Sequence, residues 1–349
     1  MLRDAELTEQ KNTKNDTNRP YIGRFAPSPS GPLHFGSLVC ALASFLHARQ
    51  ASGTWLIRIE DIDTPRIDSA FSPIIIESLA AHGMHCDDVY PNLADAGACE
   101  PDENTKHKAN GCIVYQSERH HLYQDTLNTL AASNSIYGCA CSRKDIRSRA
   151  SYYDQHCRDL GLSFEQHAVR WKNPCINSSF EDLHFGHLTV DPRMANEDPV
   201  LKRADGIYAY HLAVVADDIA QGVTHIVRGA DLIDTTVLHI EMFKALGAQP
   251  PTYLHIPVAV SEAGQKLSKQ HHAPAIDASR ASDNLKSALM FLGMSTEQLS
   301  PISNTSDVSK IVSWAIDNWR PNMLPKQTEI LTFQANNVYC VNNPPQSVQ

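Results

Sequence analysis

The chain has 349 residues, of which 42% are hydrophobic and 20% charged, and its formal net charge is −9. These values are typical of a globular protein of about two or three domains, and the negative charge argues against a protein that coats nucleic acid non-specifically. No apolar run approaches the roughly 18 residues of a membrane-spanning helix. Residues 1–19 are polar, unlike a signal peptide, and the nine cysteines are an odd count, so we expect a disordered N-terminal tail and a reducing, cytoplasmic location without a disulfide framework.

Regular structure is expected from residue 20. YIGRFA predicts a short buried strand, and PSPSGP predicts a turn-rich connection. Apolar residues at 38, 42, 45 and 46 have the spacing of an amphipathic helix, and WLIRIED predicts a second strand. Strand, helix and strand in this order indicate an α/β fold with a parallel sheet. In such folds ligands bind at the carboxyl ends of strands and at helix N-termini.

The rest of the chain alternates between irregular and regular stretches. The segment 87–111 is polar, acidic and without periodicity, which predicts a flexible surface insertion. A second irregular stretch around residues 173–199 is expected to hold a short hairpin. YHLAVVADD and THIVRG return to regular structure, helix-type spacing follows residue 276, and the end of the chain is expected to be frayed.

Two separated stretches together suggest a phosphate site. GRFAPSPSGPLHFGSL places His34 at the start of a predicted helix, where unpaired backbone N–H groups attract phosphate. An imidazole there can stabilise charge on a phosphate oxygen, although a tight turn with a satisfied histidine explains this stretch alone equally well. Far downstream, GQKLSKQ places Lys266 and Lys269 in a glycine-initiated loop, and lysine suits polyphosphate. Taken alone, a lysine pair in a loop is usually solvated surface.

These residues resemble the class I aminoacyl-tRNA synthetases. PLHFGS stands where that family has its HIGH signature, and KLSKQ where it has its KMSKS loop; LIRIEDIDTPR, YHLAVVADD and GVTHIVRGADL are similar to the glutamyl branch. The resemblance implies a Rossmann-type sheet in which ATP, accompanied by magnesium, and L-glutamate form glutamyl-adenylate. It implies His34, Lys266 and Lys269 as catalytic residues, and it implies an ATP site formed by His34, Gly36, Ser37 and Lys269.

A glutamate pocket must pair two carboxylates and one ammonium group. Arginine suits a carboxylate because its planar fork contacts both oxygens, so Arg24 and Arg228 are candidates, with Glu60 for the ammonium group. Surface ion pairs are the alternative for the arginines, and a core position is the alternative for Tyr210. The resemblance favours a glutamate site and implies its members, which are Arg24, Phe25, Ala26, Pro27, Ser28, Glu60, Tyr210 and Arg228.

Three cysteines have a spacing that suggests one structural zinc ion. Cys139 and Cys141 are two residues apart, and Cys157 follows sixteen residues later. Buried free thiols are the alternative, and by chemistry alone His156 is favoured over Tyr153 as the fourth ligand. A short subfamily similar to glutamyl synthetases has the pattern Cys-x-Cys, Tyr, Cys, which implies Tyr153. From its charge alone, the basic cluster at 143–149 is a solvated helix face. In class I enzymes this region approaches the acceptor end of tRNA, which makes the cluster a candidate phosphate contact.

Only residues 270–349 follow Lys269, which is too short for a stem-contacting region and an anticodon-binding domain. The same short subfamily activates glutamate without tRNA and transfers it to the cyclopentenediol of queuosine, the wobble base of tRNA(Asp). We therefore expect L-glutamate, ATP and that anticodon stem-loop as partners of a monomer, with no membrane or DNA. A synthetase that charges a tRNA 3′ end and an idle tRNA-binding paralogue are the alternatives. The expected layout is 1–19 tail, 20–116 first half of the catalytic domain, 117–199 zinc-containing insertion, 200–275 second half, 276–333 helical region and 334–349 tail.

Overall fold

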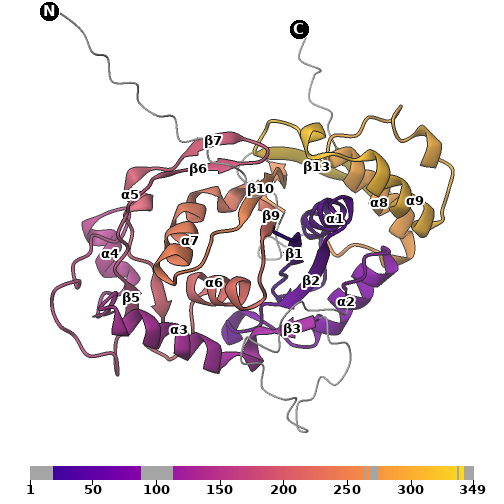
Figure 1. Cartoon of the computed structure of the whole chain (residues 1–349). Coiled ribbons are helices and arrows are strands. Elements are labelled where there is room, and N and C mark those ends of the chain that lie inside the picture. The colour runs from indigo at the N-terminus through magenta and orange to yellow at the C-terminus, as the bar shows by residue number, and fades with distance from the viewer. Residues whose placement is uncertain (1–18, 88–112, 263–264, 268–273, 336–337, 342–349) are drawn as a thin grey trace, which may run out of the picture.

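A seven-stranded sheet lies at the centre of the molecule (Figure 1). The computed structural model describes residues 19–87, 113–262, 265–267, 274–335 and 338–341. The sheet comprises, in spatial order, β3 (Ile113–Tyr115), β2 (Thr54–Ile59), β1 (Ile22–Phe25), β9 (His225–Gly229), β10 (Thr252–Ile256), β6 (Ser179–Asp182) and β7 (Gly186–Thr189). All neighbours are parallel except β6 and β7. The predicted α/β fold with a parallel sheet is therefore confirmed.

The chain leaves β1 in one direction through β2 and β3, and it later returns to the other side of β1 with β9 and β10. Between β1 and β9 the strand order thus reverses. In open α/β sheets the crevice at the carboxyl ends of the strands at such a point is where ligands bind. This geometry places the candidate site after Phe25 and after Gly229.

Helices cover both faces of the sheet (Figure 1). On one face, α1 (Phe35–Gln50) packs with α8 (Ala281–Phe291) and α9 (Val308–Asn318) in the largest apolar core, with α2 (Phe71–Ala81) beside them. On the other, α6 (Tyr210–Ala220) and α7 (Ile233–Ala245) share a core with α3 (His120–Ala132). The apolar positions that predicted the first helix, at 38, 42, 45 and 46, are all buried, as the helical period requires.

The region between β3 and α6 contains a second, three-stranded antiparallel sheet. It consists of β4 (Ile136–Cys139), β5 (Ala168–Trp171) and β8 (Val200–Lys202). The short helices α4 (Arg143–Arg149) and α5 (Pro192–Ala195) lie in the same region. The expected hairpin within residues 173–199 is present as β6 and β7. However, this hairpin joins the main sheet, because β6 pairs with β10.

The C-terminal region differs from the expectation of helices over 276–333 and a frayed tail. Here β13 (Glu329–Ala335) pairs in parallel with β11 (Val258–Glu262) and antiparallel with β14 (Val338–Val341), and β12 (Gln265–Lys266) completes this sheet. Ile330 and Thr332 are buried, whereas the apolar Leu331 and Phe333 are exposed. The sequence therefore lacks the alternation of apolar and polar residues by which a half-buried strand is recognised.

Short 3₁₀ helices complete the fold at Thr64–Arg66, Gln116–Glu118, Ala230–Leu232, Ala278–Arg280, Ser300–Ile302 and Pro321–Met323. Among the described helices, none has the length and apolar character needed to cross a bilayer. Six described cysteines are free thiols, whereas Cys86 is disulfide-bonded, which differs from the expectation of reduced cysteines. The polar segment expected at 87–111 and the predicted N-terminal tail lie almost entirely outside the described residues.

Candidate functional site

A cavity of about 680 Å³ opens at the carboxyl ends of β1 and β9, where the strand order reverses. It brings together residues from both halves of the sheet that are up to about 240 positions apart in sequence. The predicted site residues that line it are Arg24, Phe25, Ala26, Pro27, Ser28, His34, Gly36, Ser37, Glu60, Tyr210, Arg228 and Lys266. Lys269 lies outside the described residues. The sequence thus located the cavity, and the role of each residue in it is still a prediction.

His34 forms the N-cap of α1 at the wall of this cavity. Its Nδ1 accepts a hydrogen bond from the backbone N–H of Ser37 at 3.3 Å, and its Nε2 lies 3.0 Å from the Ser37 hydroxyl. A Cβ atom at Gly36 would lie 3.2 Å from the imidazole, so glycine leaves the ring its space. The histidine therefore caps the helix and lines the cavity at the same time, which combines the two interpretations of this stretch.

A network of buried charges lies beside Arg24 and Glu60, which line the cavity. Arg24 pairs with Asp218 at 3.0 Å, and Arg58 pairs with the same carboxylate at 2.7 Å and with Glu60 at 3.3 Å. Burial disfavours the charged form of Asp218, but both guanidinium groups outweigh it and lower its pKa. Burial raises the pKa of Glu60 against the opposing effect of the two arginines. Arg24 therefore already has a carboxylate partner within the protein.

Arg228 differs from Arg24 in this respect. Its guanidinium donates hydrogen bonds to the hydroxyl of Thr236 at 2.7 Å and to the carbonyl of Leu232 at 3.1 Å. It also donates to Nε2 of His255 at 3.1 Å and lies 3.2 Å from Nδ1 of His239. The side chain is buried, yet no carboxylate of the described residues lies within 4.0 Å of it. Its hydrogen-bond partners in the described part of the chain are therefore all uncharged acceptors.

The histidines around Arg228 form a chain of neutral rings. Nδ1 of His255 contacts Asp182 at 2.7 Å, and Nε2 of His239 contacts Nδ1 of His211 at 3.0 Å. Burial, together with the charge of Arg228, lowers the pKa of His211 to about 4 and also lowers the pKa of His239. None of these histidines, nor Asp182, was predicted as a site residue, because each lies within a regular element and carries no local motif.

Two further residues restrict the chemistry at the cavity. Lys266 forms an ion pair with Asp231 at 2.5 Å and has 44% of its side chain exposed. Cys40 also lines the cavity, but burial raises the pKa of its thiol to about 11. A thiol with this pKa is a poor nucleophile at neutral pH. The cavity is therefore suited to binding charged groups, and its cysteine is not suited to covalent catalysis.

The three predicted cysteines lie together beside the small antiparallel sheet. The sulfur atoms of Cys139, Cys141 and Cys157 lie within 4.8 Å of one another. The Tyr153 hydroxyl lies 3.4 Å from the Cys139 sulfur and accepts a hydrogen bond from the Cys157 backbone N–H. His156 is exposed and is not part of this group. Three thiols are donors that fit zinc, and the Tyr153 hydroxyl lies beside them.

This fold is that of a class I tRNA synthetase catalytic domain. The family described as "tRNA synthetases class I (E and Q), catalytic domain" matches residues 22–328. A glutamate tRNA ligase from Elizabethkingia meningosepticum, solved in complex with its amino acid, superposes with a TM-score of 0.68 at 22% identity. That match covers 88% of this chain and 66% of the ligase.

Sequence relatives narrow the assignment. The protein named glutamyl-Q tRNA(Asp) synthetase from Vibrio vulnificus is 41% identical over 90% of this chain and 94% of its own length. The protein of the same name from Vibrio parahaemolyticus is 42% identical over 89% and 96%. The chain belongs to the glutamyl-Q tRNA(Asp) synthetase family. It is accordingly a ligase of the aminoacyl-tRNA synthetase class, with a function like that of the glutamate–tRNA ligases.

Proposed function

We propose that the enzyme activates L-glutamate with ATP in the absence of tRNA. It then transfers the glutamyl group to the cyclopentenediol of queuosine at the wobble position of tRNA(Asp). One observation carries the choice of glutamate. The guanidinium of Arg228 is buried, and it has no carboxylate partner among the described residues. The choice of acceptor is supported by the names of the relatives, because the match to this chain covers almost the full length of each relative.

A buried guanidinium without an anion is costly, because its charge is desolvated and uncompensated. Arg228 lines the cavity, and its hydrogen-bond partners among the described residues are all uncharged acceptors, so a carboxylate that enters the cavity supplies the missing charge. Arg24 is already paired with Asp218, and it contributes a second positive side chain beside Glu60. Glu60 is the acidic group available to the substrate ammonium. These charges complement an amino acid that has an acidic side chain.

The first step needs no protein nucleophile, since the α-carboxylate of glutamate is itself nucleophilic. One of its oxygens bonds to the α-phosphorus of ATP, the bond to the bridging oxygen breaks, and pyrophosphate leaves with magnesium. His34 at the N-terminus of α1, with Lys266 and Lys269, would stabilise the negative charge that develops on the phosphate oxygens. Catalysis is then a matter of positioning and charge stabilisation.

In the second step, a hydroxyl oxygen of the queuosine diol attacks the carbonyl carbon of the adenylate. An ester bond forms, the bond from that carbon to the phosphate oxygen breaks, and AMP leaves, with the hydroxyl proton released to solvent. One structural zinc ion, held by Cys139, Cys141, Tyr153 and Cys157, would stabilise the region that contains the three-stranded sheet.

Transfer of labelled glutamate to total tRNA from two strains tests this function. One strain makes queuosine and the other does not. Label that appears only on the queuosine-containing pool, and is lost when periodate oxidises the diol before the reaction, is expected. Equal labelling of both pools would show 3′-end charging instead. Glutamate-dependent exchange of pyrophosphate into ATP without tRNA tests the first step alone, and its absence would favour an idle paralogue.

A further inference from the structure

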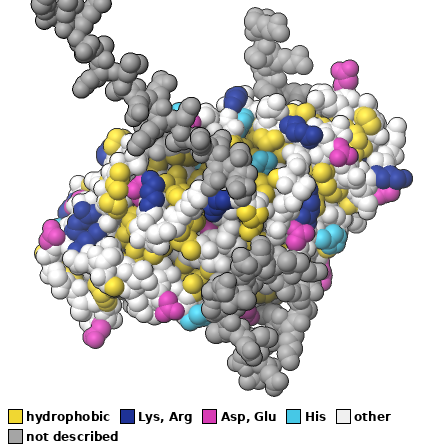
Figure 2. All heavy atoms as spheres, viewed as in Figure 1, with side chains coloured by type: hydrophobic (Ala, Val, Ile, Leu, Met, Phe, Trp, Pro, Cys, Tyr) yellow, Lys and Arg dark blue, Asp and Glu magenta, His cyan; other side chains and the backbone are white. Residues whose placement is uncertain are grey.

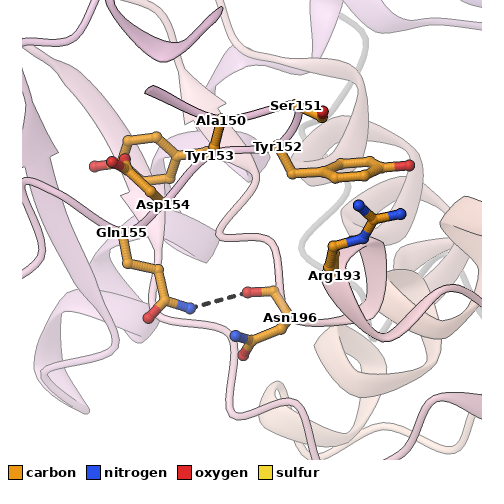
Figure 3. A pocket seen from close by; sticks show the side chains of 8 residues that line it. All are labelled: Ala150, Ser151, Tyr152, Tyr153, Asp154, Gln155, Arg193 and Asn196. Carbon is orange, nitrogen blue, oxygen red and sulfur yellow. Dashed lines mark hydrogen bonds between the residues drawn. The ribbon is translucent and has the colours of Figure 1, made fainter. Parts of the chain in front are cut away.

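We propose that a pocket beside the cysteine cluster binds one unpaired nucleotide of an RNA, whose base lies against Tyr152 and Arg193 (Figure 3). This site is separate from the cavity that lies at the strand ends. It rests on the proposed function only in taking tRNA as the RNA concerned. The pocket has a volume of about 320 Å³ and lies between the segment that follows α4 and the end of α5.

One side of the pocket offers a flat surface for a base. The Arg193 guanidinium lies over the Tyr152 ring, 5.5 Å from its centroid (Figure 3). Asp191 accepts hydrogen bonds from Arg193 at 2.6 Å and 3.1 Å, which fixes the plane of the guanidinium. Proteins bind unpaired bases by stacking them on aromatic rings and on arginine planes. Tyr152 and Arg193 together provide both kinds of surface.

Another side of the pocket carries amide groups. The side-chain amide of Gln155 donates to the backbone carbonyl of Asn196 at 2.9 Å, which joins the two segments across the pocket (Figure 3). Within the part of the chain that the structure describes, no hydrogen bond occupies the side-chain amide of Asn196 or the hydroxyl of Tyr152. An amide with a free donor and a free acceptor matches the edge of a base.

The pocket is built on a rigid support. Tyr153, the neighbour of Tyr152, is buried among Cys139 and Cys157. The Arg170 guanidinium lies 3.7 Å from the centroid of the Tyr153 ring, on its face. Because the Tyr153 side chain packs against both cysteines and Arg170, it anchors the backbone next to Tyr152. A pocket held in this way loses little entropy when a ligand binds.

The charge around the pocket favours RNA over an uncharged ligand. Residues 143–158 contain five Arg or Lys and two Asp, a net charge of +3 in a chain whose net charge is −9. Arg143, Lys144 and Arg147 on α4 are exposed, and none forms an ion pair with a described residue. Lys and Arg side chains gather at this end of the molecule in Figure 2. Such a surface attracts the phosphates that flank a bound nucleotide.

Tyr152→Ala, Tyr152→Phe and a control, Phe164→Ala, test the proposal. Phe164 is a suitable control because it is an exposed aromatic residue in the same region but outside this pocket. The measurement is filter binding of tRNA(Asp) purified from cells that make queuosine. We expect Tyr152→Ala to weaken binding about tenfold, as the loss of one stacked base predicts. Tyr152→Phe and the control should stay within about twofold of the wild type.

Salt dependence separates stacking from charge. Lys144→Gln should reduce the slope of log Kd against log salt by about 0.7 to 0.9, whereas Tyr152→Ala should leave it unchanged. Glutamate-dependent pyrophosphate exchange without tRNA should be unaffected in every variant, which also shows that each is folded. Cross-linking of wild-type enzyme to tRNA containing 4-thiouridine, followed by mass spectrometry, should place the cross-link in the segment 150–155.

The proposal that the pocket binds a nucleotide would be overturned if Tyr152→Ala bound tRNA as tightly as the wild type, with pyrophosphate exchange intact. A cross-link confined to other segments would overturn it as well. A failure of the proposed function looks different. In that case the wild type transfers no glutamate to queuosine-containing tRNA, while Tyr152→Ala still weakens binding of the same tRNA and the pocket proposal stands.

Discussion

Arg228 donates its Nε–H to Nε2 of His255 at 3.1 Å. That nitrogen must therefore be unprotonated, and the single proton of the ring is on Nδ1, where Asp182 accepts it at 2.7 Å. Burial lowers the pKa of His255 and keeps the ring neutral, although Asp182 acts in the opposite direction. Asp182 thus determines the orientation of Arg228 through the tautomer of the histidine between them, and it belongs to β6, outside the segments that form the cavity.

Asp182→Asn tests whether Asp182 orients Arg228 through the tautomer of His255. The new amide can present an N–H to Nδ1 of His255, which favours the tautomer with its proton on Nε2, and two donors would then face each other at Arg228. We expect the KM for glutamate to rise about tenfold, because a buried donor that loses its acceptor costs about 1–3 kcal/mol, while the KM for ATP stays unchanged. Pyrophosphate exchange measures both. Asp205→Asn, an exposed site, is the control, and an equal rise in both KM values would indicate a general loss of structure.

Arg228→Gln tests the charge match itself. Without the guanidinium, the glutamate carboxylate enters the cavity with one positive partner fewer, so kcat/KM for glutamate should fall by about 100-fold or more. The preference for glutamate over glutamine should narrow at the same time. Both amino acids are compared by pyrophosphate exchange, and Arg203→Gln on the surface serves as the matched control. An unchanged KM for glutamate would remove Arg228 from the amino-acid site.

The zinc site makes a separate prediction about its fourth ligand. The purified wild type should contain roughly one zinc ion per chain, Cys141→Ser should contain almost none, and Tyr153→Phe should release zinc to a chelator faster than the wild type. His156→Ala should behave as the wild type, because this side chain is exposed and lies outside the cysteine group. Metal analysis and chelator kinetics give the answer. Loss of zinc from His156→Ala, with retention in Tyr153→Phe, would reverse the assignment.

The parallel sheet and the position of the cavity could be predicted, because both depend on local patterns. The change from strand to helix period after residue 35 and the short motifs at His34 and Lys266 are visible in the sequence without any knowledge of distant contacts. The rule that ligands bind at the carboxyl ends of parallel strands then brings together the residues that follow β1 and β9.

The buried hydrogen bonds and ion pairs behind the cavity residues could not be predicted, because they join residues that are distant in sequence. Asp182 and His255 are 73 residues apart, and Arg58 and Asp218 are 160 apart. Neither pair has a motif, and the buried Arg58 in the strand WLIRIED gives no indication of its partner. The strand β13 was missed for another reason, since its register is determined by pairing with Val258–Val260 and its outward side chains are apolar.

A second group of histidines, which are partly buried, lies at the opposite ends of the strands from the cavity. The Tyr21 hydroxyl contacts Nδ1 of His47 at 2.8 Å, and the Tyr21 ring stacks on His225 at 4.1 Å. Burial lowers the pKa of both histidines to about 4, and repulsion from His225 adds to the shift of His47. Both rings are therefore neutral in the folded protein at pH values where the unfolded chain, with an ordinary pKa of about 6.5, becomes protonated.

The stability of the fold should therefore decrease as the pH is lowered from 6.5 towards 4. In this window the unfolded state binds more protons than the folded state, so each histidine contributes a slope of at most about 1.4 kcal/mol per pH unit, reduced by the partial exposure of both rings. Urea unfolding at pH 7 and pH 5 measures the change. The double variant His47→Gln, His225→Phe keeps the contact with Tyr21 and the stacked ring but removes both titrating groups, so its stability should fall less between the two pH values. Because His211 and His239 are still present, some dependence should remain. A double variant with the full wild-type slope would show that protonation of other groups causes the loss.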